Sequence, residues 1–122
     1  MPHVRIDLSE AHRGRIAELS DAVHHSLVAG LDMIPDDLFQ IFHVHSSEEL
    51  VFSATFPGAN RSDLIFIQIL ATVGYSTEAK QRFFTELETH FRDLSIPRDH
   101  LMVSIIETSA DNWYAPGAEV AG

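Results

Sequence analysis

The sequence predicts an α/β (α+β) fold in which a duplicated β-α-β unit forms one four-stranded sheet with two helices on one face. Two observations lead to this fold class. The order strand, helix, strand occurs twice along the 122 residues. A connector with a proline follows each predicted helix, and the two prolines, Pro35 and Pro97, stand 62 positions apart (97 − 35). Because β-α-β crossovers are right-handed almost without exception, both helices are expected on the same face.

The first unit begins with residues 4–8, where apolar and charged side chains alternate as in a half-buried strand. A helix follows, because apolar residues recur every three or four positions. They are Ile16, Leu19, Val23, Leu27 and Leu31. Gly30 and Pro35 mark the end of this helix, and residues 37–44, rich in Phe, Ile and Val, predict the second strand. Residues 45–61 are irregular, with a short edge strand expected around residues 50–52.

The second unit repeats this order. Residues 64–70 form a strongly apolar strand, Ser76 is placed to cap the next helix, and residues 101–106 form the last long strand. The apolar stripe of this helix consists of Phe83, Phe84, Leu87, Phe91 and Leu94. Adding the same 62 positions to Pro2 gives Leu64, where the second unit begins. We expect one domain over residues 1–122, with internal repeats at about 2–60 and 64–122.

The strand at residues 64–70 also indicates an oligomer. Nearly every residue in it is apolar, and such a strand is usually covered on both faces. Two helices on one face leave the other face bare, so further copies of the chain are expected to cover it. The turn-rich segment 111–117 offers two aromatic side chains, and we expect it to reach toward a neighbouring subunit.

The composition excludes several classes of function. The chain has no cysteine, which rules out disulfides, thiolate catalysis and cysteine zinc sites. Its formal net charge of -10 repels nucleic acid phosphates and anionic membranes, so neither is an expected partner. No apolar run approaches the ~20 residues that span a bilayer, and no signal pattern opens the chain. We expect a soluble, cytoplasmic protein that uses no cofactor.

Pro2 is the strongest candidate for chemistry. If Met1 is removed, its nitrogen becomes a free secondary amine, which no other residue type offers. An ordinary α-amine has a pKa near ~8, and apolar surroundings lower that value because they disfavour the charged form. Such an amine can take a proton from carbon near neutral pH and return it elsewhere. The plain alternative is that Met-Pro is only a common way for a chain to begin.

Several segments of the chain carry a family resemblance. They are residues 1–8, 21–24, 35–40, 60–63, 67–69, 76–80 and 111–113. Together they resemble the tautomerase superfamily, whose members use an amino-terminal proline, and they look closest to its malonate semialdehyde decarboxylase-like branch (4-oxalocrotonate tautomerase-like). The resemblance implies a homotrimer of the predicted fold. It also implies that Pro2 is the acid/base, that Asp37 orients or activates water, and that Trp113 and Tyr114 line the site.

One departure from the resemblance concerns the substrate anchor. Decarboxylase-like members carry two arginines in an Arg-x-Arg-Ser pattern before the second helix, where they hold the substrate carboxylate. Here the pattern reads Val73-Gly74-Tyr75-Ser76, so both arginines are missing. We therefore expect decarboxylation of malonate semialdehyde to be weak or absent.

Other side chains must then bind the substrate. Tyr75 stands where family members hold an arginine, and its hydroxyl is expected to donate a hydrogen bond to the carbonyl oxygen, with Val73 beside it. Arg61 and Arg5 are the remaining candidates for an anchor, although Arg61 suits a structural role in a turn equally well.

The histidines and the adjacent aspartates are weaker candidates for site residues than Pro2. His24 matches a family position near the active site, but it would serve equally as a packing residue. His43 and His45 lie on one side of a strand at a spacing that can bind a metal, yet no third ligand is evident, so no metal is expected. Asp36 and Asp37 are predicted to point to opposite faces of a strand and therefore not to share a proton.

Two classes of function remain open. In the first, the chain is an enzyme that moves protons between carbon and oxygen of a small carbonyl or enol substrate, with Pro2 as base; a decarboxylase or hydratase of 3-oxo acids is the related alternative. In the second, a non-catalytic trimer keeps the scaffold and binds a small ligand. The presence or absence of Met1 discriminates between them, because the amide nitrogen of an internal proline is not basic.

Overall fold

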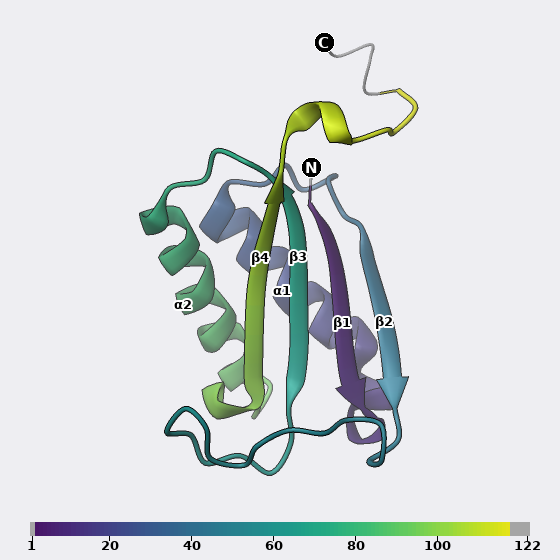
Figure 1. Ribbon diagram of the computed structural model, residues 1–122, viewed down its shortest axis with the longest axis vertical. Coiled ribbons are helices and arrows are strands. Elements are labelled where there is room, and N and C mark those ends of the chain that lie inside the picture. Colours follow the sequence, from purple (N-terminus) through teal and green to yellow (C-terminus); the bar gives the residue numbers. More distant parts are fainter. Residues whose placement is uncertain (1, 118–122) are drawn as a thin grey trace.

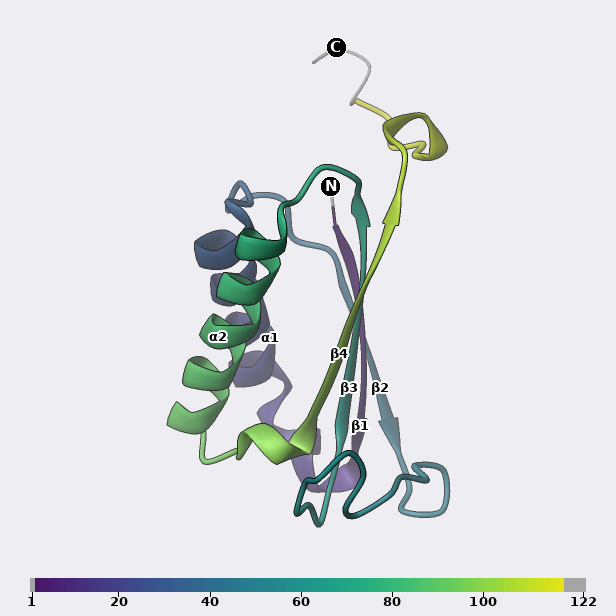
Figure 2. The same ribbon diagram turned by 60° about the vertical axis from the view of Figure 1, so that its left-hand side comes forward.

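The computed structural model describes residues 2–117 and has the fold class predicted from the sequence (Figure 1). Four strands form one sheet in the order β2-β1-β3-β4, and both helices lie on one face of it (Figure 2). The strands are β1 (His3–Ser9), β2 (Gln40–His45), β3 (Ile65–Thr72) and β4 (Leu101–Thr108). The helices are α1 (Ile16–Leu31) and α2 (Thr77–Asp93), with 3₁₀ turns η1 (Glu10–Arg15), η2 (Arg98–His100) and η3 (Ala110–Asn112).

The two halves of the chain meet at the centre of the sheet. Each half supplies a parallel pair, β1 with β2 and β3 with β4, and the antiparallel pair β1–β3 joins them. The elements recur at the spacing seen in the sequence. The starts of β1 and β3, and likewise the ends of α1 and α2, are separated by the same interval as Pro35 and Pro97. Because β1 and β3 run in opposite directions, the start of β1 lies beside the end of β3.

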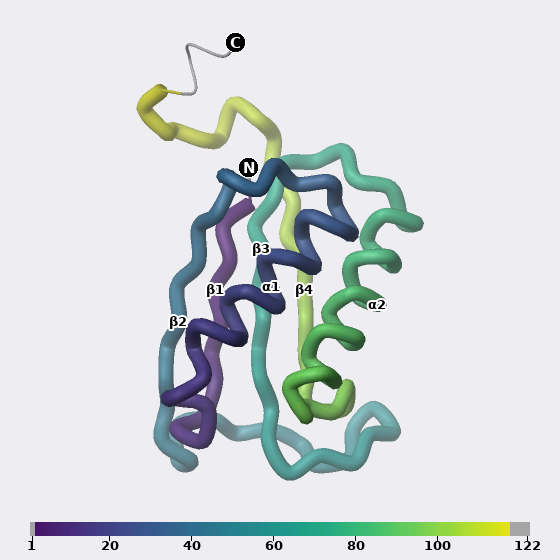
Figure 3. Tube along the Cα trace, turned by 180° about the vertical axis from the view of Figure 1, so that it is seen from behind, coloured from purple at the N-terminus to yellow at the C-terminus, as the bar shows by residue number. Residues whose placement is uncertain are grey.

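Both helices cross the same face of the sheet (Figure 3), and the buried core residues come from that face and from the helices. Alternate residues of β1 and β3 point into the core, as the period of two in the sequence predicts. Its buried members include Val4, Ile6, Leu8, Leu19, Val23, Leu27, Ile65, Ile67, Ile69, Phe83, Leu87 and Phe91. Burying one such side chain contributes roughly 1.5–3 kcal/mol. Among residues 2–117, no helix has the length and apolar composition needed to span a membrane.

The second strand is shorter than predicted. It begins at Gln40 rather than at residue 37, and the preceding residues form a turn in which the N–H of Asp37 donates to the carbonyl of Ile34 at 2.8 Å. Leu38 and Phe39 extended the apolar pattern in the sequence, yet their side chains are 47% and 52% exposed. The prediction that residue 37 belongs to a strand was therefore wrong.

The edge strand expected around residues 50–52 is absent. These residues lie in the irregular connector between β2 and β3, which runs along the end of the sheet farthest from the amino terminus (Figure 1). By contrast, β3 and β4 each continue two residues beyond the predicted ends at residues 70 and 106.

The second face of the sheet carries no helix (Figure 2). We call it the open face. On it, Phe66 and Leu70 of β3 are half-buried, and Ile41, Met102 and Ile106 are 47%, 44% and 45% exposed. The strand β3 is thus apolar on both sides, whereas the described part of the chain covers only one of them.

The helices α1 and α2 pack so closely that one contact leaves no room for a side chain. A Cβ atom at Gly30 would lie 2.4 Å from the Cα of Phe83, well inside van der Waals contact. Gly30 is therefore a packing residue inside α1 rather than its terminator. The helix ends after Leu31, where Asp32 adopts the left-handed conformation with φ of 54°.

Gly30→Ala is expected to lower the free energy of unfolding by about 1–3 kcal/mol, the usual cost of overpacking. The added methyl group meets the backbone of Phe83, so relief requires movement of the whole of α2. Urea unfolding followed by circular dichroism measures the change. Gly14→Ala is the matched control, because a Cβ at Gly14 meets nothing within 4 Å. Equal stability of the two variants would contradict the close helix contact.

Candidate active site

Four segments that are far apart in the sequence meet at one end of the sheet (Figure 1). They are the residue before β1, the connector 32–39 after α1, the connector 73–76 before α2, and the end of β4. We call this region the Pro2 end, because Pro2 stands directly before β1. The N–H of Val4 donates to the carbonyl of Phe39 at 3.0 Å, which fixes connector 32–39 beside the start of β1.

Pro2 is buried, and its side chain faces the helices. Val4, two residues later, points into the core, and side chains alternate along a strand. The register of β1 and β3, continued by one residue, places Pro2 beside Ala71, which pairs with Glu107 of β4. Neighbouring strands lie roughly 5 Å apart, so the carboxylate of Glu107 stands on the same side of the sheet as Pro2, about two strands away.

Asp37 reaches the Pro2 end on a turn. The Nε2 of His24 donates to the carbonyl of Pro35 at 2.7 Å and so ties that turn to α1. One carboxylate oxygen of Asp37 is buried. His24 therefore holds the connector that carries Asp37 at the Pro2 end.

Tyr75 follows β3 and packs against the core at the same end. Its hydroxyl donates to the sulfur of Met33 at 3.4 Å. Burial raises the pKa of Tyr75, and the negative charges of Asp37, Asp32 and Glu107 raise it further. The phenol therefore stays protonated at neutral pH and can donate a hydrogen bond.

The rest of connector 73–76 holds Tyr75 in place. The N–H of Val73 donates to the carbonyl of Thr108 at 2.9 Å, while its side chain is 55% exposed. Gly74 has a φ of 128°, a conformation that side chains rarely allow. The hydroxyl of Ser76 accepts a hydrogen bond from the N–H of Ala79 at 3.1 Å, so the predicted helix cap is confirmed.

Trp113 and Tyr114 belong to the segment that leaves β4 and projects beyond the Pro2 end (Figure 2). The indole of Trp113 is half-buried, and its N–H is buried with no hydrogen-bond partner among residues 2–117. Tyr114 is 90% exposed. This segment thus projects away from the sheet and helices of the described chain (Figure 2).

The two other arginine candidates do not reach the Pro2 end. Arg61 lies in the connector at the opposite end of the sheet, where its buried guanidinium donates to the carbonyls of Ser53, Phe56 and Asp99. Its donors are used to hold that connector, so within one subunit the prediction of Arg61 as a substrate anchor is replaced by a structural role. Arg5 lies on the open face.

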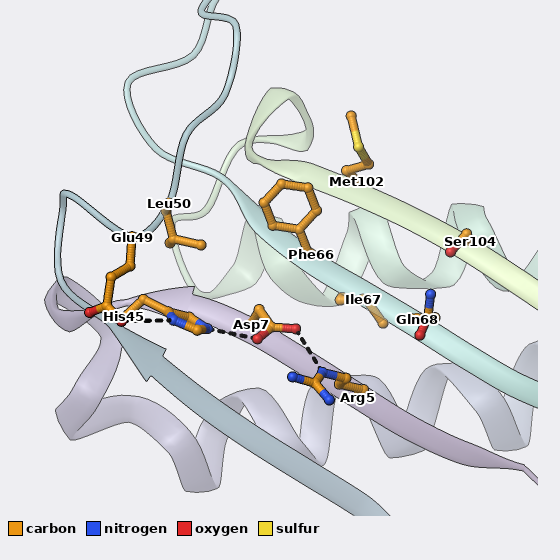
Figure 4. Close-up of a pocket in the computed structure, with 10 residues that line it drawn as sticks. All are labelled: Arg5, Asp7, His45, Glu49, Leu50, Phe66, Ile67, Gln68, Met102 and Ser104. Atoms are coloured by element: carbon orange, nitrogen blue, oxygen red, sulfur yellow. Dashed lines mark hydrogen bonds and ion pairs between the residues drawn. The ribbon is translucent and has the colours of Figure 1, made fainter.

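A hollow of about 460 Å³ lies on the open face rather than at the Pro2 end (Figure 4). Within it, Nε2 of His45 contacts the carboxylate of Asp7 at 2.7 Å, and Nε of Arg5 donates to the same carboxylate at 3.3 Å. Burial raises the pKa of Asp7, but these two hydrogen bonds outweigh burial and hold it below its usual value. This cluster was not predicted from the sequence, in which its only signal is the alternation of Arg5 and Asp7 on one strand.

The histidine pair considered as a metal site has a different arrangement. The rings of His43 and His45 are stacked with centroids 6.3 Å apart, and His45 is engaged by Asp7. Over the described range 2–117, no group of three side chains is arranged to hold a metal ion.

The family follows from comparison with known proteins. A family model described as tautomerase enzyme matches residues 37–114, well over half of the chain. The chain therefore belongs to the tautomerase family. A relative described as probable tautomerase YrdN, from Bacillus subtilis (strain 168), is 28% identical over 115 residues, covering 93% of this chain and 89% of that protein.

Solved structures share the fold. FG41 malonate semialdehyde decarboxylase inhibited by 3-bromopropiolate matches with a TM-score of 0.88 and 25% identity, covering 98% of this chain and 94% of that one. A wild-type fused 4-OT described as a symmetric trimer matches with a TM-score of 0.79 and 12% identity over 98% of each chain. The family and the fold inferred from the sequence are confirmed.

The phenol of Tyr75 is expected to ionise above its ordinary pKa of 10.0. Alkaline titration followed by phenolate absorbance measures the pKa of Tyr75. The transition that disappears in Tyr75→Phe is the one that belongs to Tyr75. Asp37→Asn should move that transition to lower pH, because one of the negative charges that disfavour the phenolate is gone. A transition at or below pH 10.0 in the wild-type protein would show that Tyr75 is solvated and distant from these carboxylates.

Proposed function

We propose that the chain is a keto–enol tautomerase whose general acid/base is the amine of Pro2 after removal of Met1. One observation carries the proposal: the buried Pro2 shares one end of the sheet with Asp37 and Tyr75, although these residues lie far apart in the sequence. Apolar neighbours disfavour the charged form of an amine, which brings its pKa toward neutrality. Membership of the tautomerase family supports the assignment.

The reaction needs one base and one hydrogen-bond donor. The lone pair of Pro2 takes a proton from the carbon next to a carbonyl, the C–H electrons form the C=C bond, and the carbonyl π electrons move to oxygen. The hydroxyl of Tyr75 donates to that oxygen as its negative charge develops. The protonated Pro2 then returns the proton to oxygen, which gives the enol; the reverse sequence ketonises an enol substrate.

Asp37 and the aromatic residues have supporting roles in this proposal. The carboxylate of Asp37 offsets the positive charge that Pro2 carries between the two proton transfers, and it orients water if the substrate is hydrated instead. His24 positions Asp37 through the carbonyl of Pro35. Trp113 and Tyr114 would line the substrate from the segment that leaves β4.

Decarboxylation is the weaker enzymatic candidate. The similarity to malonate semialdehyde decarboxylase favours it, but connector 73–76 supplies Val73 and Tyr75 where the decarboxylase-like pattern has two arginines. Each charge-assisted hydrogen bond to a carboxylate contributes about 1.5–3 kcal/mol. Without both bonds, we expect decarboxylation of malonate semialdehyde to be weak or absent.

Pro2→Ala is expected to lower the rate of enol ketonisation by two or more orders of magnitude, the size typical of losing a positioned general base. Intact mass must first show that Met1 is absent from both proteins. Pro97→Ala is the matched control, since Pro97 occupies the connector after α2, at the other end of the sheet. Ketonisation of simple 2-keto acid enols and neutral enols, followed by absorbance, provides the rates.

Two results would refute this proposal. Unchanged ketonisation in Pro2→Ala would remove the proline from the mechanism. Retention of Met1 in the native protein, with no turnover of any substrate, would favour the alternative that the chain is a non-catalytic trimer binding a small ligand.

We also propose that the chain acts as a homotrimer in the cytoplasm. The apolar side chains on the open face, among them Ile41, Met102 and Ile106, need a cover that the described part of the chain does not provide. Closed cyclic symmetry would bury this face in every subunit at once. A trimeric neighbour of the same fold supports this number of subunits. The segment with Trp113 would then reach an adjacent subunit.

Light scattering at micromolar concentration is expected to give three times the mass of a single chain. Met102→Asp should shift the measured mass toward that of one chain, because it places a charge in the apolar contact. Glu88→Asp on α2 is a control on the helix side, away from the open face. A wild-type mass equal to that of one chain would refute the oligomer. A dimer mass would refute the trimer but would agree with the idea that another copy of the chain covers the open face.

A further inference from the structure

We propose that the substrate is a neutral, apolar carbonyl compound and that carboxylates are disfavoured at the Pro2 end. The inference rests on the proposed function for the position of the site, but it concerns a property that can be measured without turnover. It follows from the placement of the lysine and arginine side chains within one chain, from the carboxylates around Tyr75, and from exposed apolar side chains at the same end.

All eight lysine and arginine residues lie in the described range, so their positions can be compared. Six of them are far from connector 73–76 or on the other face. They are Arg5 on the open face, Arg13 and Arg15 before α1, Arg61 in the connector between β2 and β3, Arg92 near the end of α2, and Arg98 before β4. Only Lys80 and Arg82 belong to the first two turns of α2, close to the Pro2 end.

Both of these cations are already engaged. The ammonium of Lys80 pairs with the carboxylate of Glu107. The Nε of Arg82 donates to the carbonyl of Gly30 at 3.0 Å, and its Nη2 lies 3.5 Å from the carboxylate of Asp32. A substrate carboxylate would have to displace one of these partners, and it would gain little from the exchange.

Around Tyr75, the three carboxylates of Asp37, Asp32 and Glu107 outnumber the two cations, Lys80 and Arg82, so the balance of charge is negative. Burial raises the pKa of the Tyr75 hydroxyl first, and the negative charges of Asp37, Asp32 and Glu107 raise it further. A neutral carbonyl accepts a hydrogen bond from the phenol without opposing these charges. A carboxylate on the substrate would be repelled there by the excess negative charge.

Exposed apolar side chains mark the same end of the sheet. Ile34 is 71% exposed, Phe39 52% and Val73 55%, and Leu38 stands beside them in the chain. They come from the two connectors that also carry Asp37 and Tyr75. Large apolar side chains exposed at this end of the sheet favour an apolar ligand over a charged one there.

A matched pair of ligands tests the inference by binding alone. Benzylacetone and hydrocinnamate share the phenethyl group and differ in that one ends in a methyl ketone and the other in a carboxylate of similar shape. Chemical-shift titration of the His3, Val4 and Tyr75 amides gives both affinities. We expect the ketone to bind at least about tenfold more tightly, and higher salt to narrow the difference by screening the carboxylates.

Glu107→Gln provides the charge test. It removes one negative charge and frees Lys80, so affinity for hydrocinnamate should rise about threefold to tenfold, while affinity for benzylacetone should stay within about twofold. Asp93→Asn is the matched control. It removes the same charge at the far end of α2, about 24 Å along the helix from Thr77, and should change neither affinity.

The outcomes separate this inference from the proposed function. Three results would overturn the proposed substrate class, whatever the ketonisation rate in Pro2→Ala. They are equal or tighter binding of hydrocinnamate, no binding of either ligand at these amides, and no change in affinity for hydrocinnamate in Glu107→Gln. Preferential binding of benzylacetone with no loss of ketonisation in Pro2→Ala would keep the ligand class and remove the catalytic role of the proline.

Discussion

The antiparallel pairing of β1 with β3 is the constraint on which the candidate site depends. It sets the start of the chain beside the end of β3 and so brings Pro2 to the connector that carries Tyr75. The parallel pairing of β1 with β2 adds the connector that carries Asp37. Neither connector has regular structure of its own, and each is anchored by few hydrogen bonds, such as that from His24. The sheet therefore provides the regular framework of the site, and the side chains of Asp37 and Tyr75 are carried by connectors at one end of it.

Most of the fold could be predicted because its signals are local. Periods of two and of three to four residues reflect one buried side of each strand and helix, and the matching positions of Pro35 and Pro97 revealed the repeat. The error in the second strand has a clear cause. Leu38 and Phe39 read as a strand because apolar residues usually pack inside, yet here they are exposed at the Pro2 end. A sequence pattern does not distinguish an apolar side chain that serves the core from one that serves a surface.

The site was predictable only where a residue has a chemistry of its own. Pro2 stood out because removal of Met1 would make it a terminal secondary amine, and the resemblance added Asp37, but the contact of Tyr75 with Met33 depends on tertiary structure. The cluster of Arg5, Asp7 and His45 was missed for a related reason. His45 and Asp7 belong to different strands, and their contact depends on a register that the sequence does not specify.

The second repeat has a counterpart of Pro2, and its backbone nitrogen shows why a basic amine requires a chain terminus. Leu64 stands before β3 as Pro2 stands before β1, and it is 1% exposed. Its nitrogen is an amide that donates to the side chain of Asp63 at 2.9 Å. No substitution at Leu64 could make that nitrogen basic, since only a break in the backbone would free it. The two halves can therefore be alike in architecture, but a continuous polypeptide can have only one reactive amine of this kind.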